Sequence, residues 1–349
     1  MTAQPDVWDS KPVQPIIAHA TETGALGVCQ LKRLWSISRA KRAGQITHAA
    51  FADEWAADTA LLDLLGVGIE QFYQHLLPQN IDFAALEAWI LALNQGALPS
   101  AKVQRYNALI RGESIVAREA VEPVLSQAQL DFWHQYGYVV VPDAAPAAQI
   151  QATHDMIWQA LGKSPADPNS WYQHHPLQQG IMVQLFQHPL LDANRNAARV
   201  QGAFAQLWQR TDLWANTDRV GFNPPETPTR PFQGPRLHWD VSLKTPIPFG
   251  LQGILYLSDT AANQGAFTLV PGMHRTLETW LSGLAEWANP RQQDLYALGA
   301  VPIAGKSGDL IIWHQALAHG ASPNTANLPR IVQYLTWQPF DRVIESEWI

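Results

Sequence analysis

The sequence predicts an α+β protein in which a helical N-terminal part precedes a domain of short strands. Up to about residue 120, apolar side chains recur mostly at three- and four-residue steps, the spacing of amphipathic helices. After Gly180, short apolar runs alternate with turns that contain Pro, Gly and Asn, as in β-barrels and double-sheet sandwiches. We therefore divide the 349 residues into a helical module, 1–120, and a strand-rich domain, 121–349.

Three helices are expected in the helical module. The first covers 47–65 and stops at Gly66, and the second covers 69–77 and ends before Pro78. Asp82 is a suitable N-cap for a third helix at 83–93, because its side chain can accept a hydrogen bond from a free amide of the first turn. No metal-ligand spacing, phosphate loop or repeat occurs here, so packing is the simplest role for the module.

The second domain opens with a helix, a strand and another helix. Ser126 is the expected N-cap of a helix that runs to Tyr136, and Gly137 breaks it. A strand at 138–142 and a helix at 147–161 follow. Further strands are expected in four apolar runs, which cover residues 250–257, 266–270, 310–313 and 331–337.

Composition excludes several classes of protein. A hydrophobic fraction of 47% and a charged fraction of 15% are typical of a well-packed globular chain. The net charge of −7 argues against nucleic acid as a partner. Cys29 is the single cysteine, so neither an intramolecular disulfide nor a Cys-rich zinc module is possible. We see no leader pattern in residues 1–15 and no apolar run long enough to span a membrane, so we expect a cytoplasmic protein without membrane contact.

The segment His238-Trp239-Asp240 is the first candidate for chemistry. On a strand, residues two apart point to the same face, so His238 and Asp240 can converge on one metal ion. One more histidine would complete two-histidine, one-carboxylate ligation, which leaves coordination positions open and is used by Fe(II) oxygenases. A three-residue pattern alone is weak evidence, because a surface pair would look the same.

The second half of this pattern lies between Gly308 and Arg330. His319 is followed by Gly320, which allows the backbone to approach a metal closely, and His314 is its rival as third ligand. A strand with His319, a tight turn at 322–327 and a returning strand from Arg330 would bring an arginine to the same site. Its guanidinium can form a bidentate pair with the distant carboxylate of a 2-oxo diacid that chelates the metal.

These motifs resemble the phytanoyl-CoA dioxygenase family. The resemblance covers about 125–338 and is carried by four stretches: LSQAQLDFWHQYGYVVVP at 125–142, HWD at 238–240, NQGAFTLVPGMH at 263–274 and GDLIIWHQALAHGASPNTANLPR at 308–330. It implies a double-stranded β-helix, that is, a jelly-roll or cupin-like core with flanking helices. It also implies hydroxylation coupled to decarboxylation of 2-oxoglutarate, with Fe(II), 2-oxoglutarate and O2 as cofactor and co-substrates.

The resemblance also assigns residues by position. His238, Asp240 and His319 match the iron ligands, and Arg330 matches the arginine that holds 2-oxoglutarate. Tyr256 matches an aromatic residue beside the co-substrate, although an ordinary strand aromatic would look the same. Asn223 resembles a polar residue that contacts the other end of the co-substrate, although a turn-forming Asn before Pro224-Pro225 is the simpler interpretation. The sequence departs from the family at two places. Met273 replaces a turn serine, and Ala321 stands where a serine often helps to hold the carboxylate; the adjacent Ser322 is expected to face the other way on a strand.

We therefore expect an oxygenase that hydroxylates an unactivated C–H of a small organic substrate. Related halogenases leave the position of Asp240 small so that chloride can bind, and a carboxylate there favours hydroxylation or desaturation. The alternatives are a jelly-roll enzyme that uses another divalent metal without 2-oxoglutarate, and a non-catalytic small-molecule binding protein. The helical module could pack, cover the pocket, form a homodimer or contact a carrier protein. Five basic residues near the predicted strands could meet an anionic group, although each is more simply a surface charge: Arg219, Arg236, Lys244, Arg275 and Lys306.

Overall fold

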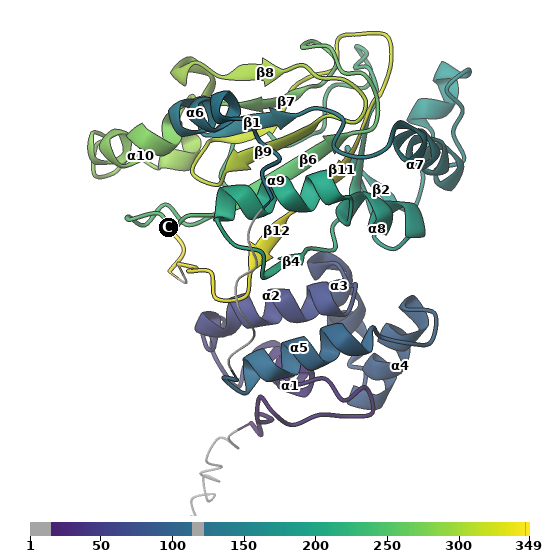
Figure 1. Ribbon diagram of the computed structural model, residues 1–349, viewed down its shortest axis with the longest axis vertical. Helices are drawn as coiled ribbons and strands as arrows, with labels where there is room; N and C mark the ends of the chain where they lie inside the picture. The colour runs from purple at the N-terminus through teal and green to yellow at the C-terminus, as the bar shows by residue number, and fades with distance from the viewer. Residues whose placement is uncertain (1–14, 114–121, 346) are drawn as a thin grey trace, which may run out of the picture.

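The computed structural model describes residues 15–113, 122–345 and 347–349. Its N-terminal module is helical, and its second domain combines antiparallel sheets with helices (Figure 1). The helices of the module are α1 (Leu31–Arg42), α2 (Trp55–Leu64), α3 (Ile69–Gln79), α4 (Phe83–Leu93) and α5 (Ser100–Ile110). The predicted boundary at residue 120 falls on 114–121, outside the described residues.

Local signals predicted some of these helices better than others. Helix α4 begins as expected, because Asp82 Oδ1 accepts a hydrogen bond of 2.7 Å from the Ala85 amide. The helix predicted at 47–65 is shorter: a 3-10 turn at Ala52–Glu54 leads into α2. Helices α1 and α5 were not predicted. Neither has a side-chain cap, so the usual start signal is missing from their sequences.

The second domain opens with the predicted elements. Ser126 caps α6 (Gln127–Tyr136) in a capping box with Gln129, and Gly137 ends it with a φ of 75°. Strand β1 (Tyr138–Val141) and α7 (Ala147–Ala160) follow. Three further helices lie in the part expected to contain only strands: α8 (Pro189–Arg195), α9 (Ala198–Trp208) and α10 (Met273–Ser282).

Two antiparallel sheets form the core of this domain. The larger has seven strands in the order β1-β9-β6-β11-β5-β3-β2, and the smaller has the order β10-β7-β8. The expected double-stranded β-helix with flanking helices is confirmed. The strands of the larger sheet are β2 (Gln178–Gln179), β3 (Met182–Val183), β5 (Val220–Asn223), β6 (Leu251–Tyr256), β9 (Leu310–His314) and β11 (Arg330–Tyr334) in addition to β1; those of the smaller are β7 (Phe267–Leu269), β8 (Val301–Ile303) and β10 (His319–Ala321).

The larger sheet separates two hydrophobic cores. Side chains such as Leu310 and Ile312 point from β9 toward the core that α7, α8 and α9 cover. Their neighbours Ile311 and Trp313 point the other way, into the core between the two sheets, where Tyr256 also lies. Because strand residues alternate in direction, one strand contributes to both layers. The interior of the jelly roll is therefore the second of these cores.

The helical module packs directly on the jelly-roll domain. Trp214, on strand β4 (Leu213–Ala215), is buried in the core of the module, and Phe340 packs at its edge just after β12 (Trp337–Pro339). Tyr106 of α5 meets both rings edge-on, with centroid distances of 6.1 and 6.0 Å. Strand β4 pairs with β12 beside these helices (Figure 1). Within the described residues, no helix has the length and apolarity that crossing a membrane requires.

Candidate metal centre

His238, Asp240 and His319 lie together at the end of the jelly roll. His238 and His319 exchange both backbone hydrogen bonds in an isolated bridge, with N–O distances of 2.9 and 3.0 Å. The prediction that residues 238–240 form a strand was wrong, because this bridge is the only pairing that the segment makes among described residues. The bridge is nevertheless sufficient to place the two imidazoles side by side, with ring centroids 4.9 Å apart.

One potential ligand atom from each residue lies within 4.8 Å of the other two. His238 Nε2 is 3.2 Å from Asp240 Oδ1, and His319 Nε2 is 3.3 Å from Asp240 Oδ2. The Nδ1 atoms lie 2.7 and 3.0 Å from the carbonyl oxygens of Arg236 and Leu317. A carbonyl only accepts, so each Nδ1 carries a proton, and each Nε2, which faces Asp240, is the atom that binds a metal once it has lost its own proton.

The three side chains also interact electrostatically. Burial opposes the charged form of Asp240, but the two histidines outweigh it and hold the pKa of this carboxyl well below its usual range. Burial likewise disfavours protonated His238, yet the hydrogen bond and charge of Asp240 raise its pKa. The cluster therefore contains an ionised carboxylate that attracts cations, and a metal ion can take the place of the protons.

His314, the rival ligand, stands apart from this cluster. It alternates with Trp313 on β9, so its ring lies on the opposite face of the larger sheet, near the rings of Trp133 and Phe249. Its Nδ1 accepts a hydrogen bond from the Ala316 amide, and burial lowers the pKa of His314 to about 4. The geometry favours His319 as the third ligand.

Gln252 is a residue of this site that the sequence analysis missed. Its Nε2 donates a hydrogen bond of 2.7 Å to Asp240 Oδ2, and its Oε1 accepts one of 3.1 Å from Trp313 Nε1. The Trp313 ring lies 5.0 Å from the His319 ring and 4.2 Å from that of Phe267. A glutamine on a strand carries no local signal, and only the pairing of Gln252 with Trp313 across β6 and β9 brings it to the carboxylate.

Arg330 is buried, with an exposed fraction of 1%, at the start of β11. Its Nε and Nη2 have no hydrogen-bond partner among the described residues. Buried N–H groups without a partner are costly, so these two free donors of the guanidinium point to an anion that completes it. Asn223 is the direct cross-strand neighbour of Arg330, and its Nδ2 donates to the Ser322 carbonyl at 3.4 Å. Asn223 and Arg330 thus face the same side of the sheet.

Tyr256 is also buried in the jelly-roll interior, where its charge environment includes Arg330. Its hydroxyl donates to the Ile303 carbonyl at 2.7 Å and accepts from the Phe267 amide at 3.0 Å. The hydroxyl therefore links β6 to β7 and β8, and burial raises the pKa of Tyr256 to about 12. The side chain can contribute a ring surface to a co-substrate more readily than a proton.

The departures from the family have simple structural outcomes. Met273 is the first residue of α10 and is buried in the jelly-roll core, so it contributes packing as well as a turn. Ser322 Oγ donates to the Ala266 carbonyl at 3.1 Å, and the preceding Ala321 is buried. The predicted turn at 322–327 does not join a hairpin, because β10 pairs with β7 in the smaller sheet and β11 with β5 and β6 in the larger.

The residues fit an iron ion with a chelating 2-oxo diacid. Two imidazoles and one carboxylate make a site of intermediate softness, and such a set leaves positions for other ligands. The exposed fraction of the side chain is 50% for Asp240 but 5% for His319, so the cluster is open on the side of Asp240. The unpartnered atoms of Arg330 supply the second observation, since a guanidinium fork matches a carboxylate.

Comparison with known proteins agrees with this chemistry. The family model for phytanoyl-CoA dioxygenase (PhyH) matches residues 133–332. A putative phytanoyl-CoA dioxygenase from Dictyostelium discoideum is 26% identical over 98 residues, 27% of this chain and 28% of that protein. The ectoine dioxygenase of Halomonas elongata is 22% identical over 247 residues, 64% of this chain and 72% of that enzyme.

Two solved structures that match part of the chain are EctD and the carbocyclase SnoK. EctD from S. alaskensis, with 2-oxoglutarate and 5-hydroxyectoine, has a TM-score of 0.45 and 18% identity, and the match covers 66% of this chain and 85% of that one. The α-ketoglutarate dependent carbocyclase SnoK from nogalamycin biosynthesis has a TM-score of 0.43 and 17% identity, with 66% and 90% covered.

Proposed function

The chain belongs to the phytanoyl-CoA dioxygenase family, and we propose that it is an Fe(II)- and 2-oxoglutarate-dependent oxygenase that hydroxylates a C–H bond of a small organic substrate. The observation that carries this proposal is the pairing of two features in one jelly roll. His238, Asp240 and His319 present ligand atoms to a common point, and Arg330 is a buried cation without an anionic partner among described residues.

In this proposal, the chain's own residues hold and orient the reactants. His238 and His319 direct Nε2 toward the metal because their Nδ1 atoms donate to backbone carbonyls. Asp240 supplies the negative ligand, and Arg330 pairs with the far carboxylate of 2-oxoglutarate. Bound Fe(II) would supply the oxidative chemistry, in which substrate, 2-oxoglutarate and O2 give hydroxylated substrate, succinate and CO2.

The burial of Arg330 and Tyr256 favours the oxygenase over the two alternative functions. Both side chains are nearly inaccessible to water, so the Arg330–carboxylate pair forms where its attraction is weakly screened. An enzyme that uses another divalent metal without 2-oxoglutarate has no need of such a guanidinium. A non-catalytic binding protein has no need of three convergent ligands.

A homodimer or carrier contact through the helical module stays a prediction.

The direct test is succinate release by purified protein. We expect succinate to form only when Fe(II), 2-oxoglutarate and O2 are all present, and to rise with a true substrate from a panel of small molecules. The His314→Ala variant should release succinate like the wild type, because His314 lies on the other face of the sheet. Anaerobic binding of Fe(II) without any binding of 2-oxoglutarate would instead support the enzyme class that uses a metal alone.

A further inference from the structure

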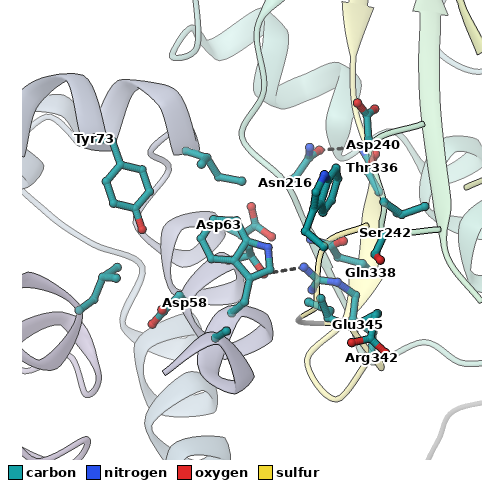
Figure 2. A pocket seen from close by; sticks show the side chains of 18 of the residues that line it. Asp58, Asp63, Tyr73, Asn216, Asp240, Ser242, Thr336, Gln338, Arg342 and Glu345 are labelled. Atoms are coloured by element: carbon teal, nitrogen blue, oxygen red, sulfur yellow. Dashed lines mark hydrogen bonds between the residues drawn. The ribbon is translucent and has the colours of Figure 1, made fainter. Parts of the chain in front are cut away.

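A large chamber lies between the helical module and the jelly roll, next to Asp240. Its volume is about 910 Å³, near the upper end of the range for cavities that hold drug-sized ligands. Helices α1, α2 and α3 form one wall, and β6 with the residues after Asp240 forms another. Figure 2 shows Tyr73, Asp58 and Asp63 on the helical side and Asp240 on the opposite side. The chamber therefore opens onto the candidate metal centre.

A third wall comes from the last residues of the chain. Arg342 to Glu345 and Trp348 line the chamber, and Ser242 Oγ donates to the Glu347 carbonyl at 2.7 Å. Arg291 donates to the carbonyls of Trp239 and Val241, which flank Asp240, and also to that of Ile349. The C-terminal segment is thus tied to the same loop that carries Asp240.

Apolar side chains are exposed on two of these walls. Ile69 and Leu77 of α3 have exposed fractions of 43% and 36%, and Val343 and Trp348 of the C-terminal segment have 72% and 61%. Single exposed apolar residues are common on protein surfaces, but these four line one cavity. A ligand with its own apolar surface would cover them and gain free energy from the water that it displaces.

Two basic side chains of the chamber have no hydrogen-bond or ion-pair partner among the described residues. Among the acidic side chains, Asp218 pairs with Arg219, and burial raises the pKa of both Asp58 and Asp63 to about 7, which reduces their negative charge near neutral pH. Asp58 accepts a hydrogen bond from Gln30 and Asp63 one from the Thr217 amide, while Asp63 Oδ2 has no partner among the described residues. Lys41 and Arg42, at the end of α1, make no ion pair or side-chain hydrogen bond within the described part of the chain, although Lys41 attracts Glu54 and Asp58 at longer range. Basic residues suit any helix C-terminus, but these two also line the chamber.

We infer that this chamber is the substrate site of the proposed oxygenase and that its substrate is an organic anion with a sizeable apolar skeleton. The skeleton lies between α3 and the C-terminal segment, the anionic group is near Lys41 and Arg42, and the reacting C–H is near Asp240. The inference rests on the proposed function of the metal set. It gives the helical module, which lies outside the family match, a role in substrate recognition.

The test measures affinity with the full chain loaded with Fe(II) and 2-oxoglutarate under anaerobic conditions. Octanoate and octyl phosphate represent anions on an apolar chain, octylamine carries the opposite charge, and acetate lacks the chain. We expect calorimetry to detect binding of one or both octyl anions, and the tighter of the two identifies a carboxylate or a phosphate. Equal or tighter binding of octylamine or acetate would overturn the inference.

Two pairs of variants locate the binding. Leu77→Trp should weaken octyl anion binding about tenfold by filling the chamber. Leu298→Trp is its control, because Leu298 has a similar exposed fraction, 37%, and does not line the chamber. Lys41→Ala with Arg42→Ala should weaken binding about three- to tenfold, as expected for partly exposed ion pairs, and Lys102→Ala with Arg275→Ala removes the same charge elsewhere.

The outcomes separate this inference from the proposed function. If Fe(II) and 2-oxoglutarate bind but no octyl anion does, or if Leu77→Trp binds it like Leu298→Trp, the substrate inference fails and the oxygenase proposal stands. If Fe(II) and 2-oxoglutarate do not bind, the oxygenase proposal fails first. Retained Fe(II) affinity in Leu77→Trp shows that the variant is folded and that the loss is local.

Discussion

Gln252 donates a hydrogen bond of 2.7 Å to Asp240 Oδ2 and is itself held by Trp313 Nε1. Asp240 carries no other side-chain donor than Gln252 and the two histidines among described residues. The amide therefore fixes the orientation of the only acidic member of the candidate metal centre. Partners of this kind raise metal affinity because a ligand that is already oriented loses less entropy on binding.

Replacement of Gln252 by Leu should therefore weaken metal binding without removing a ligand. We expect about a tenfold loss of Fe(II) or Co(II) affinity, the lower end of the range for outer partners of metal ligands. Trp313→Phe should give a smaller loss, because the amide remains but its Oε1 is released. Anaerobic competition titration measures both. Unchanged affinity in Gln252→Leu would show that the hydrogen bond does not orient Asp240 for the metal.

The third ligand can be tested by comparing two histidines. His319→Ala should abolish tight Fe(II) binding, because it removes one of the three convergent ligand atoms. His314→Ala should leave Fe(II) affinity almost unchanged, since that ring packs on Trp133 on the other face of the sheet. Metal analysis after anaerobic loading and desalting gives the stoichiometry. The reverse pattern would make His314 the ligand.

The sequence was most informative where the chemistry is local. Asp82, Ser126 and Gly137 ended or began helices as predicted, because a cap depends on a few neighbouring residues. The pair His238 and His319 was predicted from motif order, and the structure brings both to Asp240. The local conformation of 238–240 was not predicted correctly, since a single bridge to His319 replaces a strand.

What could not be predicted depends on contacts between distant segments. Gln252 reaches Asp240 only because β6 pairs with β9, and no spacing in the sequence reveals that pairing. The chamber needs α3 and the C-terminal segment as two of its walls, which requires the docking of the two parts of the chain. Helix α1 has no side-chain cap, and its sequence gives no start signal of that kind.

The docking of the helical module predicts a large effect at Trp214. Its ring is buried among the module's side chains, with the guanidinium carbon of Arg105 4.3 Å from the ring centroid. Trp214→Ala should lower the free energy of unfolding by about 3–5 kcal/mol through the cavity it leaves. Trp287→Ala is the control, because Trp287 is 89% exposed. Urea denaturation followed by circular dichroism measures both, and equal midpoints would mean that the module is not stabilised by this contact.

Asp58 should make stability depend on pH. Burial raises the pKa of Asp58 from 3.8 to about 7. Between these values the folded protein holds a proton that the unfolded chain has released, so this contribution is complete below about pH 4 and is lost as pH rises toward 7. Asp58→Asn should therefore be about 1–3 kcal/mol more stable than the wild type at pH 8, and nearly equal at pH 4.

Urea denaturation at both pH values tests the Asp58 prediction, and Asp53→Asn, at an exposed position of the same region, is the control. A gain at pH 8 that disappears at pH 4 supports a proton on Asp58 in the folded state. Equal destabilisation at the two pH values would show that Asp58 is ionised in the folded protein and that its bond from Gln30 stabilises the charge.

The strongest test of co-substrate binding is Arg330→Met. Loss of one partner of a buried charge pair costs about 2–5 kcal/mol. At about 1.4 kcal/mol per tenfold, 2-oxoglutarate should bind roughly 30-fold to several-thousand-fold more weakly. Fe(II) affinity should change little, because Arg330 is not one of the three convergent ligands. Arg330→Lys should recover only part of the affinity, since an ammonium cannot make the two parallel hydrogen bonds of a guanidinium.

Arg199→Met, at an exposed position on α9, controls for loss of charge. Anaerobic calorimetry measures each affinity. A wild-type affinity for 2-oxoglutarate in Arg330→Met would mean that Arg330 binds another anion. The proposed pairing of Arg330 with the far carboxylate of 2-oxoglutarate would then be wrong.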